Sequence, residues 1–307
     1  METPPGEELE SGSLECTECN KVYPISNGIP RFVDRDNYAS SFGLQWNHFR
    51  SQQIDSVNGT GISAKRLYSE TEWTSNWLCG KWILDVGCGA GRFLDIASRA
   101  GSEVVGVDLS SAVDAARATF RARSNVHLVQ ASVTELPFRS EAFDGLYCIG
   151  VIQHTPDPYA SLQSLPRVLK PGAPIAVTIY ERKWWTRFHG KYLIRPLTKR
   201  VNEKMLLLAI KAVMPVVFSL TDLLFRIPFL GRIFRFAIPV ANYVDEPRLS
   251  LRQRYRWALL DTFDMLAPRY DRPQTEEEVT AALRSARIGD IRRLRTAGVN
   301  LVGRRES

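Results

Sequence analysis

The sequence predicts an α/β protein built on a seven-stranded, mostly parallel β-sheet with helices on both faces, enlarged by an α-helical insertion. Short apolar runs alternate with helix-like stretches between residues 81 and 180. The alternation then stops, and it resumes near Thr275 with one helix and two further strands. Strands that alternate with helices at this spacing are typical of a parallel sheet covered on both faces.

The elements are expected in a simple order. Residues 38–80, which are aromatic and polar, are expected to form two helices against the larger body. Five strands are expected at residues 81–87, 103–110, 126–132, 143–152 and 173–180, with helices at 92–101, 111–123 and 161–172. Thr275, followed three residues later by Glu278, is a capping box that begins a last helix. Residues 288–295 and 299–305 then form a hairpin that closes the sheet.

Composition limits the class of protein. The chain has 307 residues, 44% of them hydrophobic and 24% charged, which excludes collagen, a coiled coil and wholesale disorder. The five cysteines are too few and too scattered for a disulfide scaffold, so a reducing, cytoplasmic setting is expected. Residues 1–13 are acidic without an apolar stretch, so we expect a disordered tail there and no signal peptide.

The most informative stretch is ILDVGCGAGRF, residues 83–93, in which a strand runs into three glycines and then a helix. Glycines allow a tight turn and close approach of a ligand to helix N–H groups. Asp108 ends the next strand, seventeen residues past Gly91, where a carboxylate can accept hydrogen bonds from ribose hydroxyls. This pattern predicts a nucleoside-containing cofactor at the carboxyl edge of the sheet.

Other nucleotide sites fit this loop less well. A dinucleotide fingerprint needs glycine at the sixth position, which counted from Gly87 is Arg92, and the chain has no Lys/Ser phosphate loop. Asp85, just before the glycines, would repel a phosphate and would suit an amine-bearing ligand.

The stretch resembles the first motif of class I S-adenosylmethionine-dependent methyltransferases of the bacterial type 11 kind. VVGVDLS resembles the family's ribose-binding strand, LPFRSEAFD its link into the fourth strand, and LKPGA its turn before the fifth. The resemblance covers residues 81–180 and 274–304. It implies a Rossmann-like domain, here over residues 38–180 and 274–307, that uses S-adenosylmethionine and releases S-adenosylhomocysteine.

The resemblance also implies roles for individual residues. Asp85 would orient the methionine amine directly or through water, Asp108 would hold the ribose, and Leu109 would lie against the adenine. Ser132 stands where the family usually has an acid for the adenine amino group, which weakens that contact. The implied cofactor-binding residues are Asp85, Gly87, Cys88, Gly89, Gly91, Asp108, Leu109, Ser132, Val133, Ile149, Gly150 and Val151.

His154 is the candidate catalytic residue, because it lies just beyond the fourth strand beside the expected methyl group. A histidine titrates near working pH and can remove a proton from the acceptor. The alternative is that His154 only orders the loop. Tyr180 and Glu181, which end the fifth strand, are weaker candidates. His48, His127 and His189 are expected to be structural or at the surface.

Residues 14–37, LECTECNKVYPISNGIPRFV and its continuation, resemble part of a zinc-ribbon-like segment that precedes many bacterial methyltransferases. A structural zinc needs four ligands, whereas this segment offers only Cys16 and Cys19, so we expect no metal in the monomer. We expect instead a hairpin that docks through Tyr23, Ile25 and Ile29. The stretch FGLQWNHF that follows is expected to cover the cofactor.

The insertion, residues 181–273, carries most of the chain's basic character. Residues 182–235 contain twelve Lys or Arg and two acids, a charge of +10, so the remaining residues sum to −3 against the chain's +7. On a helix, Arg200, Lys204 and Lys211 would form a narrow stripe opposite a wide apolar surface. That apolar surface would include Leu206, Ala209, Ile210 and Val213.

Two compatible interpretations of the insertion stay open. It can be a lid over the acceptor pocket, or it can lie in an anionic membrane interface with Trp184 and Trp185 at the level of the lipid headgroups. Nucleic-acid binding is disfavoured, because the segment is too apolar for such a groove. Near its end, Arg269, Tyr270 and Asp271 either reach the pocket or form a structural corner.

These features favour a cytoplasmic methyltransferase, peripheral at the membrane under the second interpretation, that acts on an oxygen of a small-molecule or lipid-linked acceptor. Nitrogen or carbon acceptors are less favoured. A non-catalytic methyltransferase-like module that binds a membrane or a partner is the alternative, and an RNA methyltransferase is the third. No feature indicates an oligomeric state.

Overall fold

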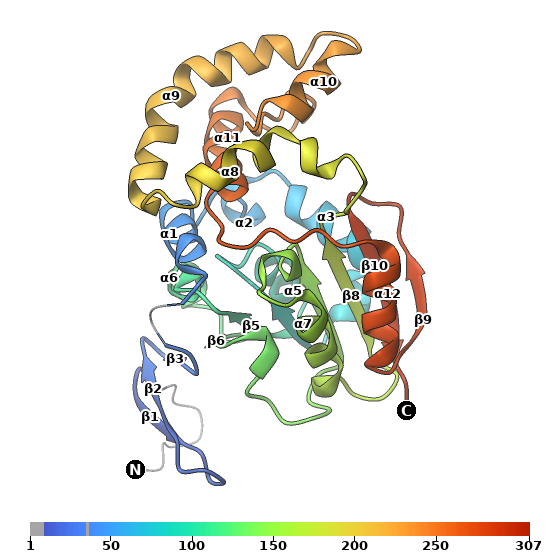
Figure 1. Ribbon diagram of the computed structural model, residues 1–307. Helices are drawn as coiled ribbons and strands as arrows, with labels where there is room; N and C mark the ends of the chain where they lie inside the picture. The colour runs from blue at the N-terminus through green and yellow to red at the C-terminus, as the bar shows by residue number, and fades with distance from the viewer. Residues whose placement is uncertain (1–8, 35–36) are drawn as a thin grey trace.

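A computed structural model describes residues 9–34 and 37–307. Its centre is a seven-stranded sheet in the order β6-β5-β4-β7-β8-β10-β9 (Figure 1). The strands are β4 (Trp82–Val86), β5 (Glu103–Asp108), β6 (Val126–Gln130), β7 (Gly145–Ile149), β8 (Pro174–Ile179), β9 (Ile288–Arg293) and β10 (Val299–Arg305). β4 to β8 are parallel, and β10 runs antiparallel to both β8 and β9. The expected class I fold is therefore confirmed.

Helices cover both faces of this sheet because alternate strand residues point to opposite sides. Ile83 packs with α3 (Ile62–Thr71), α5 (Leu94–Arg99) and α6 (Ala112–Phe120). Leu84, the next residue, packs on the other face with α7 (Pro158–Ser164) and α12 (Glu276–Ser285). The predicted capping box at Thr275 begins α12.

The segment before the sheet differs in part from expectation. Residues 1–8 of the predicted tail lie outside the described residues, but residues 11–13 belong to strand β1 (Ser11–Glu15), so a tail up to residue 13 is wrong. β1 pairs with β2 (Val22–Ser26), which pairs with β3 (Ile29–Pro30). Residues 38–80 form four helices instead of two: α1 (Ser40–His48), α2 (Asp55–Asn58), α3 and α4 (Ser75–Leu78).

The small N-terminal sheet docks on the edge of the large one, as the sequence predicted. Ile25 and Ile29 are buried and Tyr23 is half-buried against the ring of Phe32. Arg31 fixes the position, because its guanidinium forms an ion pair with Asp114 at 2.6 Å on α6. Cys16 and Cys19 follow β1 in the turn that leads to β2.

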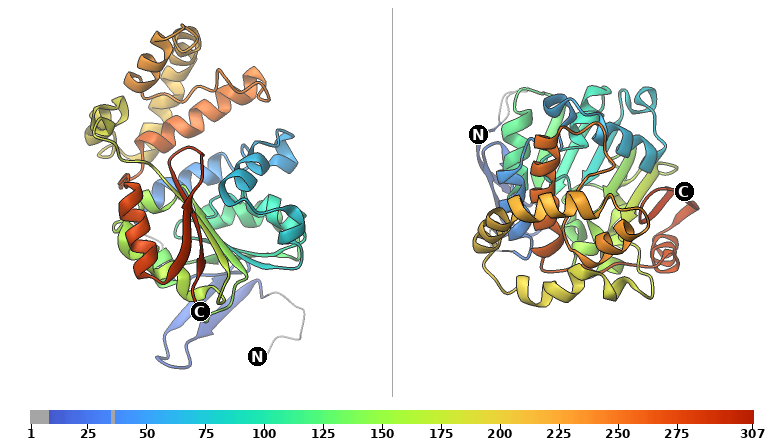
Figure 2. Two further views of the ribbon diagram at one scale, coloured as in Figure 1. Left: turned by 90° about the vertical axis from the view of Figure 1, so that its right-hand side faces the viewer. Right: turned by 90° about the horizontal axis from the view of Figure 1, so that it is seen from above.

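The insertion is helical, with α8 (Gly190–Thr198), α9 (Glu203–Leu224), α10 (Leu230–Ala237) and α11 (Leu251–Leu266). Figure 1 and the left view of Figure 2 show these helices as a layer above the sheet, at the end opposite β1–β3. α9 and α11 pack on each other and on α1 through a third apolar cluster that contains Phe49, Leu206 and Phe263.

Two details of the insertion correct the sequence interpretation. Arg200 precedes α9, so the predicted stripe with Lys204 and Lys211 does not lie on one helix. The apolar surface expected to include Leu206, Ala209, Ile210 and Val213 is divided, because Leu206 and Ile210 are buried whereas Ala209 and Val213 are exposed.

Candidate cofactor-binding and active site

A cavity of about 520 Å³ lies at the carboxyl edge of β4, β5 and β7, within the range of small-molecule sites. Its walls come from the loop after β4, the ends of the neighbouring strands, α1 and α11. Nine predicted cofactor-binding residues line it: Gly87, Cys88, Gly89, Asp108, Leu109, Val133, Ile149, Gly150 and Val151. Asp85, Gly91 and Ser132 do not.

The glycines shape the loop after β4. Gly87 has φ +78°, and a Cβ there would lie 2.2 Å from a methyl group of Val151. Gly91 has φ +91°, and its Cβ would lie 2.4 Å from the ring of Phe120. Both positions therefore exclude side chains, for conformational and for steric reasons. Gly91 supports the loop from behind instead of facing the cavity.

Asp108 reaches the cavity from the end of β5 and is held by its neighbours. Its Oδ2 accepts a hydrogen bond from the Gly89 amide at 3.0 Å. Its Oδ1 accepts from the Ser110 amide at 2.8 Å and the Ser110 hydroxyl at 2.7 Å. A carboxylate offers about four acceptor sites, so one stays available to a ribose hydroxyl. Burial raises the pKa of Asp108, and these three hydrogen bonds oppose that rise.

Asp85 is 2% exposed and lies behind the glycine loop, near Tyr147 and Cys88. Burial raises the pKa of Asp85 well above its usual range. Its Oδ2 has no hydrogen-bond partner among the described residues. Because Asp85 does not line the cavity, the direct contact with an amine is not supported, and contact through water stays a prediction.

The expected adenine side of the cavity is apolar. Leu109 and Val133 line it, together with Ile149 from the end of β7. Ser132 is engaged elsewhere, because its Oγ accepts the Thr134 amide at 3.2 Å and caps the short 3₁₀ turn η1 (Val133–Glu135). The Ser132 side chain is therefore engaged within its own loop, and the weakened contact with the adenine that its position implies stays a prediction. Cys88 is buried, as expected of a small packing residue.

His154 lines the cavity from the 3₁₀ turn η2 (Ile152–His154) and is 7% exposed. Its Nδ1 lies 3.0 Å from the carbonyl oxygen of Tyr270. A carbonyl only accepts, so this contact assigns the proton to Nδ1 and leaves a lone pair on Nε2. The rings of Phe42 and Tyr180 pack against the imidazole at 5.1 and 5.6 Å between centroids. The geometry is that of an oriented base.

Several cavity residues were not predicted individually. Tyr38, Phe42 and Trp46 line it from α1 and the segment before it, consistent with the expectation that FGLQWNHF covers the cofactor. Further unpredicted residues include seven from α3, the glycine loop and the insertion: Arg66, Arg92, Tyr243, Trp257, Asp261, Asp264 and Met265.

Two of these residues, Asp261 and Asp264, lie one turn apart on α11 and both line the cavity. Asp261 accepts a hydrogen bond from the Tyr243 hydroxyl, and Asp264 accepts one from Gln45 Nε2 at 3.2 Å. Burial, with the neighbouring Asp264 charge, raises the pKa of Asp261 to about 7. Burial also lowers the pKa of Arg92 to about 9. The cavity thus has two carboxyl groups on its α11 wall.

The remaining candidates have structural partners. Asp271 forms an ion pair with Lys191 at 2.7 Å, so it holds α8 in a structural corner. Glu181 forms ion pairs with Lys183 and Arg293 and does not line the cavity, whereas Tyr180 does.

The other three histidines also have structural contacts, as expected. His48 lies against Lys211 and His127 stacks on Trp82. His189 caps the N-terminus of α8.

Comparison with known proteins places this core in a family. Residues 84–177 match the family described as methyltransferase domain. A ubiquinone biosynthesis O-methyltransferase of Alkalilimnicola ehrlichii is 35% identical over 131 residues, 40% of this chain and 53% of that protein. The O-methyltransferase resE of Aspergillus sclerotiorum is 32% identical over 121 residues, 38% of this chain and 46% of that protein. The chain spans about half the length of these curated relatives.

Among solved structures, a SAM-dependent methyltransferase from Methanosarcina mazei is similar with a TM-score of 0.43 and 18% identity. The match covers 74% of this chain and 93% of that one.

The cavity fits S-adenosylmethionine in two respects. Asp108 retains an acceptor site for a ribose, and Leu109 and Val133 offer an apolar slot for a base. Behind the glycine loop and outside the cavity lining, Asp85 has a buried carboxyl oxygen without a hydrogen-bond partner among the described residues, which only a contact through water could use. Contact of each residue with the cofactor stays a prediction. The strand order, the glycine loop and the family match agree: this chain carries a class I S-adenosylmethionine-dependent methyltransferase domain.

Proposed function

We propose that the protein transfers a methyl group from S-adenosylmethionine to a hydroxyl oxygen of a small, lipophilic acceptor. The observation that carries this proposal is His154, whose Nδ1 is held by a carbonyl so that Nε2 is free to accept a proton inside the cavity. Transfer to an oxygen requires removal of its proton, which a positioned histidine performs. The O-methyltransferase names of the relatives support the same choice.

The residues of the cavity act mainly by positioning the cofactor and the acceptor. When bound, S-adenosylmethionine supplies a methyl group on a positively charged sulfur. Asp108 holds the ribose, and His154 Nε2 takes the hydroxyl proton as the new oxygen–carbon bond forms. The Tyr270 carbonyl keeps its hydrogen bond with Nδ1–H and stabilises the charged imidazole. Phe42 and Trp46 from α1 exclude water from this region.

The acceptor occupies the end of the cavity beside α11. Trp257 and Met265 give that end apolar surface, and Asp261 and Asp264 can accept hydrogen bonds from acceptor hydroxyls. This combination suits a compact hydroxylated head on an apolar body, including one linked to a lipid. A lipophilic acceptor is also consistent with the relatives named for ubiquinone biosynthesis. Because the five cysteines form no disulfide in the described part of the chain, we propose a cytoplasmic location.

A labelling experiment tests this proposal. The protein is incubated with S-adenosylmethionine that carries a radiolabelled methyl group, separately with a lipid extract, soluble metabolites and RNA. We expect label in the lipid extract, and at least about 100-fold slower labelling when His154→Asn replaces the wild type. Label only in RNA would contradict the proposal. No label in any fraction, from protein that binds S-adenosylhomocysteine, would favour the non-catalytic alternative.

A further inference from the structure

Helix α9 has two apolar faces, and only one of them is packed. The inward face meets α1 and α11 through Leu206, Leu207, Ile210, Met214 and Phe218, all buried. The opposite face is also apolar but exposed, and it consists of Met205, Leu208, Val213, Val216, Leu220 and Leu223. At 100° per residue these six side chains share one side of the helix. A soluble helix normally carries charges there.

The exposed apolar side chains continue onto the neighbouring elements. α10 and the turn before it add Phe229, Leu230 and Ile233, with Phe229 91% exposed. α8 and the 3₁₀ turn η4 (Thr186–Phe188) with its preceding tryptophans add Trp184, Trp185, Phe188, Leu193 and Leu197. α10 packs on both α8 and α9. α9 and α10 form the end of the molecule farthest from β1–β3, and α8 lies just below them beside α11 (Figures 1 and 2). We name these residues, with the six on α9, the apolar end.

Unpaired cations accompany the apolar end. Arg187, Lys199, Arg200, Lys204 and Arg232 are exposed, and none has an ion-pair partner among the described residues. The elements that hold them are those that carry the exposed apolar side chains. Apolar surface combined with free cations is complementary to an anionic lipid surface, where the side chains enter the bilayer and the cations meet headgroups.

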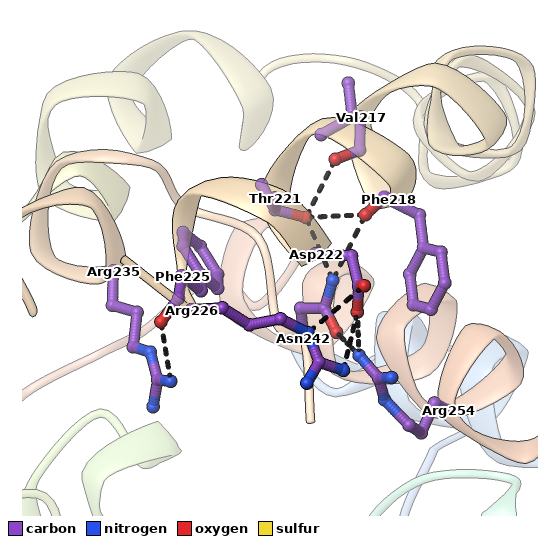
Figure 3. Close-up of polar contacts among 9 residues, drawn as sticks. All are labelled: Val217, Phe218, Thr221, Asp222, Phe225, Arg226, Arg235, Asn242 and Arg254. Carbon is purple, nitrogen blue, oxygen red and sulfur yellow. Dashed lines mark hydrogen bonds and ion pairs between the residues drawn. The ribbon is translucent and has the colours of Figure 1, made fainter. Parts of the chain in front are cut away.

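α9 is long and apolar enough to cross a membrane by length and composition, but both of its ends are attached to the rest of the protein. At its start, Glu203 accepts a hydrogen bond from Ser40 at 2.6 Å. Near its end, Asp222 pairs with Arg254 of α11, as Figure 3 shows. Asn242 donates to the Phe218 carbonyl at 3.2 Å and to Thr221 Oγ1 at 3.1 Å.

The contacts at both ends of α9 indicate whether this helix lies on a membrane or crosses it. A spanning α9 would break the Asp222–Arg254 pair and would leave the buried Arg254 side chain without this partner. It would also carry Asp222, with only Arg226 still beside it, toward lipid. Thr221, which is fully buried, would lose its packing as well. α9 therefore stays on the protein, with its inward face on α11 and its outward face presented.

We propose that the apolar end is a docking surface for an anionic lipid bilayer, on which α8, α9 and α10 lie in the interface without spanning it. Trp184 and Trp185 belong at the headgroup level, where tryptophan is enriched. Because the cavity lies between α11 and the sheet, docking places it next to the membrane surface. The proposal does not depend on methyl transfer, since the exposed side chains and cations lie outside the cavity.

Vesicle flotation of the full chain tests the proposal. One vesicle type is pure phosphatidylcholine. The other is phosphatidylcholine with roughly 30% phosphatidylglycerol, which makes its surface strongly anionic. We expect flotation with the anionic vesicles, weaker flotation with the neutral ones, and release as salt is raised. Failure to float with anionic vesicles at low salt would overturn the proposal. So would a dimer in solution that stays off vesicles, because a second copy would then cover the surface.

Matched variants locate the surface. Val216→Glu with Leu223→Glu, on the outward face of α9, is expected to weaken vesicle binding at least about tenfold. The control is Val57→Glu on α2, where the valine is exposed to a degree similar to Val216. We expect Val57→Glu to leave vesicle binding unchanged. Lys199→Glu with Arg200→Glu is expected to weaken binding at least about 25-fold.

The charge control is Arg99→Glu with Arg284→Glu, two exposed arginines on α5 and α12. It makes the same change in net charge away from the apolar end, and we expect it to retain most of the binding. Circular dichroism melts confirm that each variant is folded. Equal binding by folded wild type and the α9 variant, or equal losses in the two charge variants, would overturn the assignment of this surface.

Discussion

The imidazole of His154 is the residue on which the proposed chemistry depends. Because the Tyr270 carbonyl binds Nδ1–H, the ring is oriented by the segment that follows α11 as well as by β7. An asparagine can keep the hydrogen bond to Tyr270 while it removes the base. The variant His154→Asn therefore distinguishes a role of His154 in proton removal from a role in ordering the loop.

We predict that His154→Asn lowers the rate of methyl transfer by about 10²- to 10⁴-fold, the usual contribution of a general base. Binding of S-adenosylhomocysteine should stay within about twofold of wild type, since His154 does not hold the ribose. The checks are single-turnover labelling and calorimetry on the same preparation. An unchanged rate would mean that His154 only orders the loop.

Asp261 gives a residue-scale prediction about pH. Burial raises its pKa in the folded protein to about 7, whereas an unfolded aspartate titrates near about 4. Between these values the folded state binds more protons, so this group's contribution to stability decreases as pH rises from about 4 to about 7. Asp261→Asn keeps an acceptor for Tyr243 and removes the titration.

We therefore expect the melting temperature of wild type, relative to Asp261→Asn, to fall between pH 5 and pH 8. Thermal unfolding of both proteins at unit steps of pH measures this difference. A difference that is constant across the series would show that Asp261 does not titrate in this window.

The site residues differ in how far the sequence could predict them. Asp108 and His154 follow apolar strands, and the ends of parallel strands meet at one edge, so their convergence was predictable. Asp261 lies on α11, far along the chain, and no local pattern ties it to the glycine loop. Ser132 was placed beside the base only by its position after the third strand, and the capping of η1 by its hydroxyl was not predicted.

Among the elements, the loop after β4 is the most constrained. Gly91 and Gly80 both have positive φ, but a Cβ at Gly80 would meet nothing within 4 Å, whereas one at Gly91 would strike Phe120. Alanine at position 80 therefore tests the cost of backbone strain alone, whereas alanine at position 91 adds the steric conflict with Phe120.

We expect Gly80→Ala to cost about 1 kcal/mol of unfolding free energy and Gly91→Ala about 1 to 3 kcal/mol more. Urea unfolding measures both values. Equal losses would show that Phe120 moves aside freely and that packing does not require glycine at position 91.

The strands of the large sheet agree with the prediction from the sequence, whereas several short helices were not predicted. The five parallel strands are buried and are continuous apolar runs, which made them recognisable. β9, which is mostly exposed, was recognisable only as one arm of the hairpin with β10. α2 and α4 have four residues each, too few to show a helical period, so residues 38–80 were expected to form two helices instead of four. Pro166 interrupts the helix expected over residues 161–172, which ends as α7 at Ser164 and continues as a 3₁₀ turn.

For the whole molecule, the structure separates a methyltransferase body from a basic, apolar end, with the cavity between them. The charge of residues 182–235 was evident in the sequence, but its surface distribution was not. α9 is apolar on both sides, and only its packing on α1 and α11 shows which side is left exposed.

The central claim is that the cavity at the ends of β4, β5 and β7 binds S-adenosylmethionine, and calorimetric titration with S-adenosylhomocysteine tests it most directly. We predict saturable binding at one site, weakened about 10- to 100-fold by Asp108→Ala, which removes a charge-assisted hydrogen bond. Ser132→Ala, on the same edge but outside the cavity lining, should bind like wild type. The absence of saturable heat from folded wild-type protein would contradict the account.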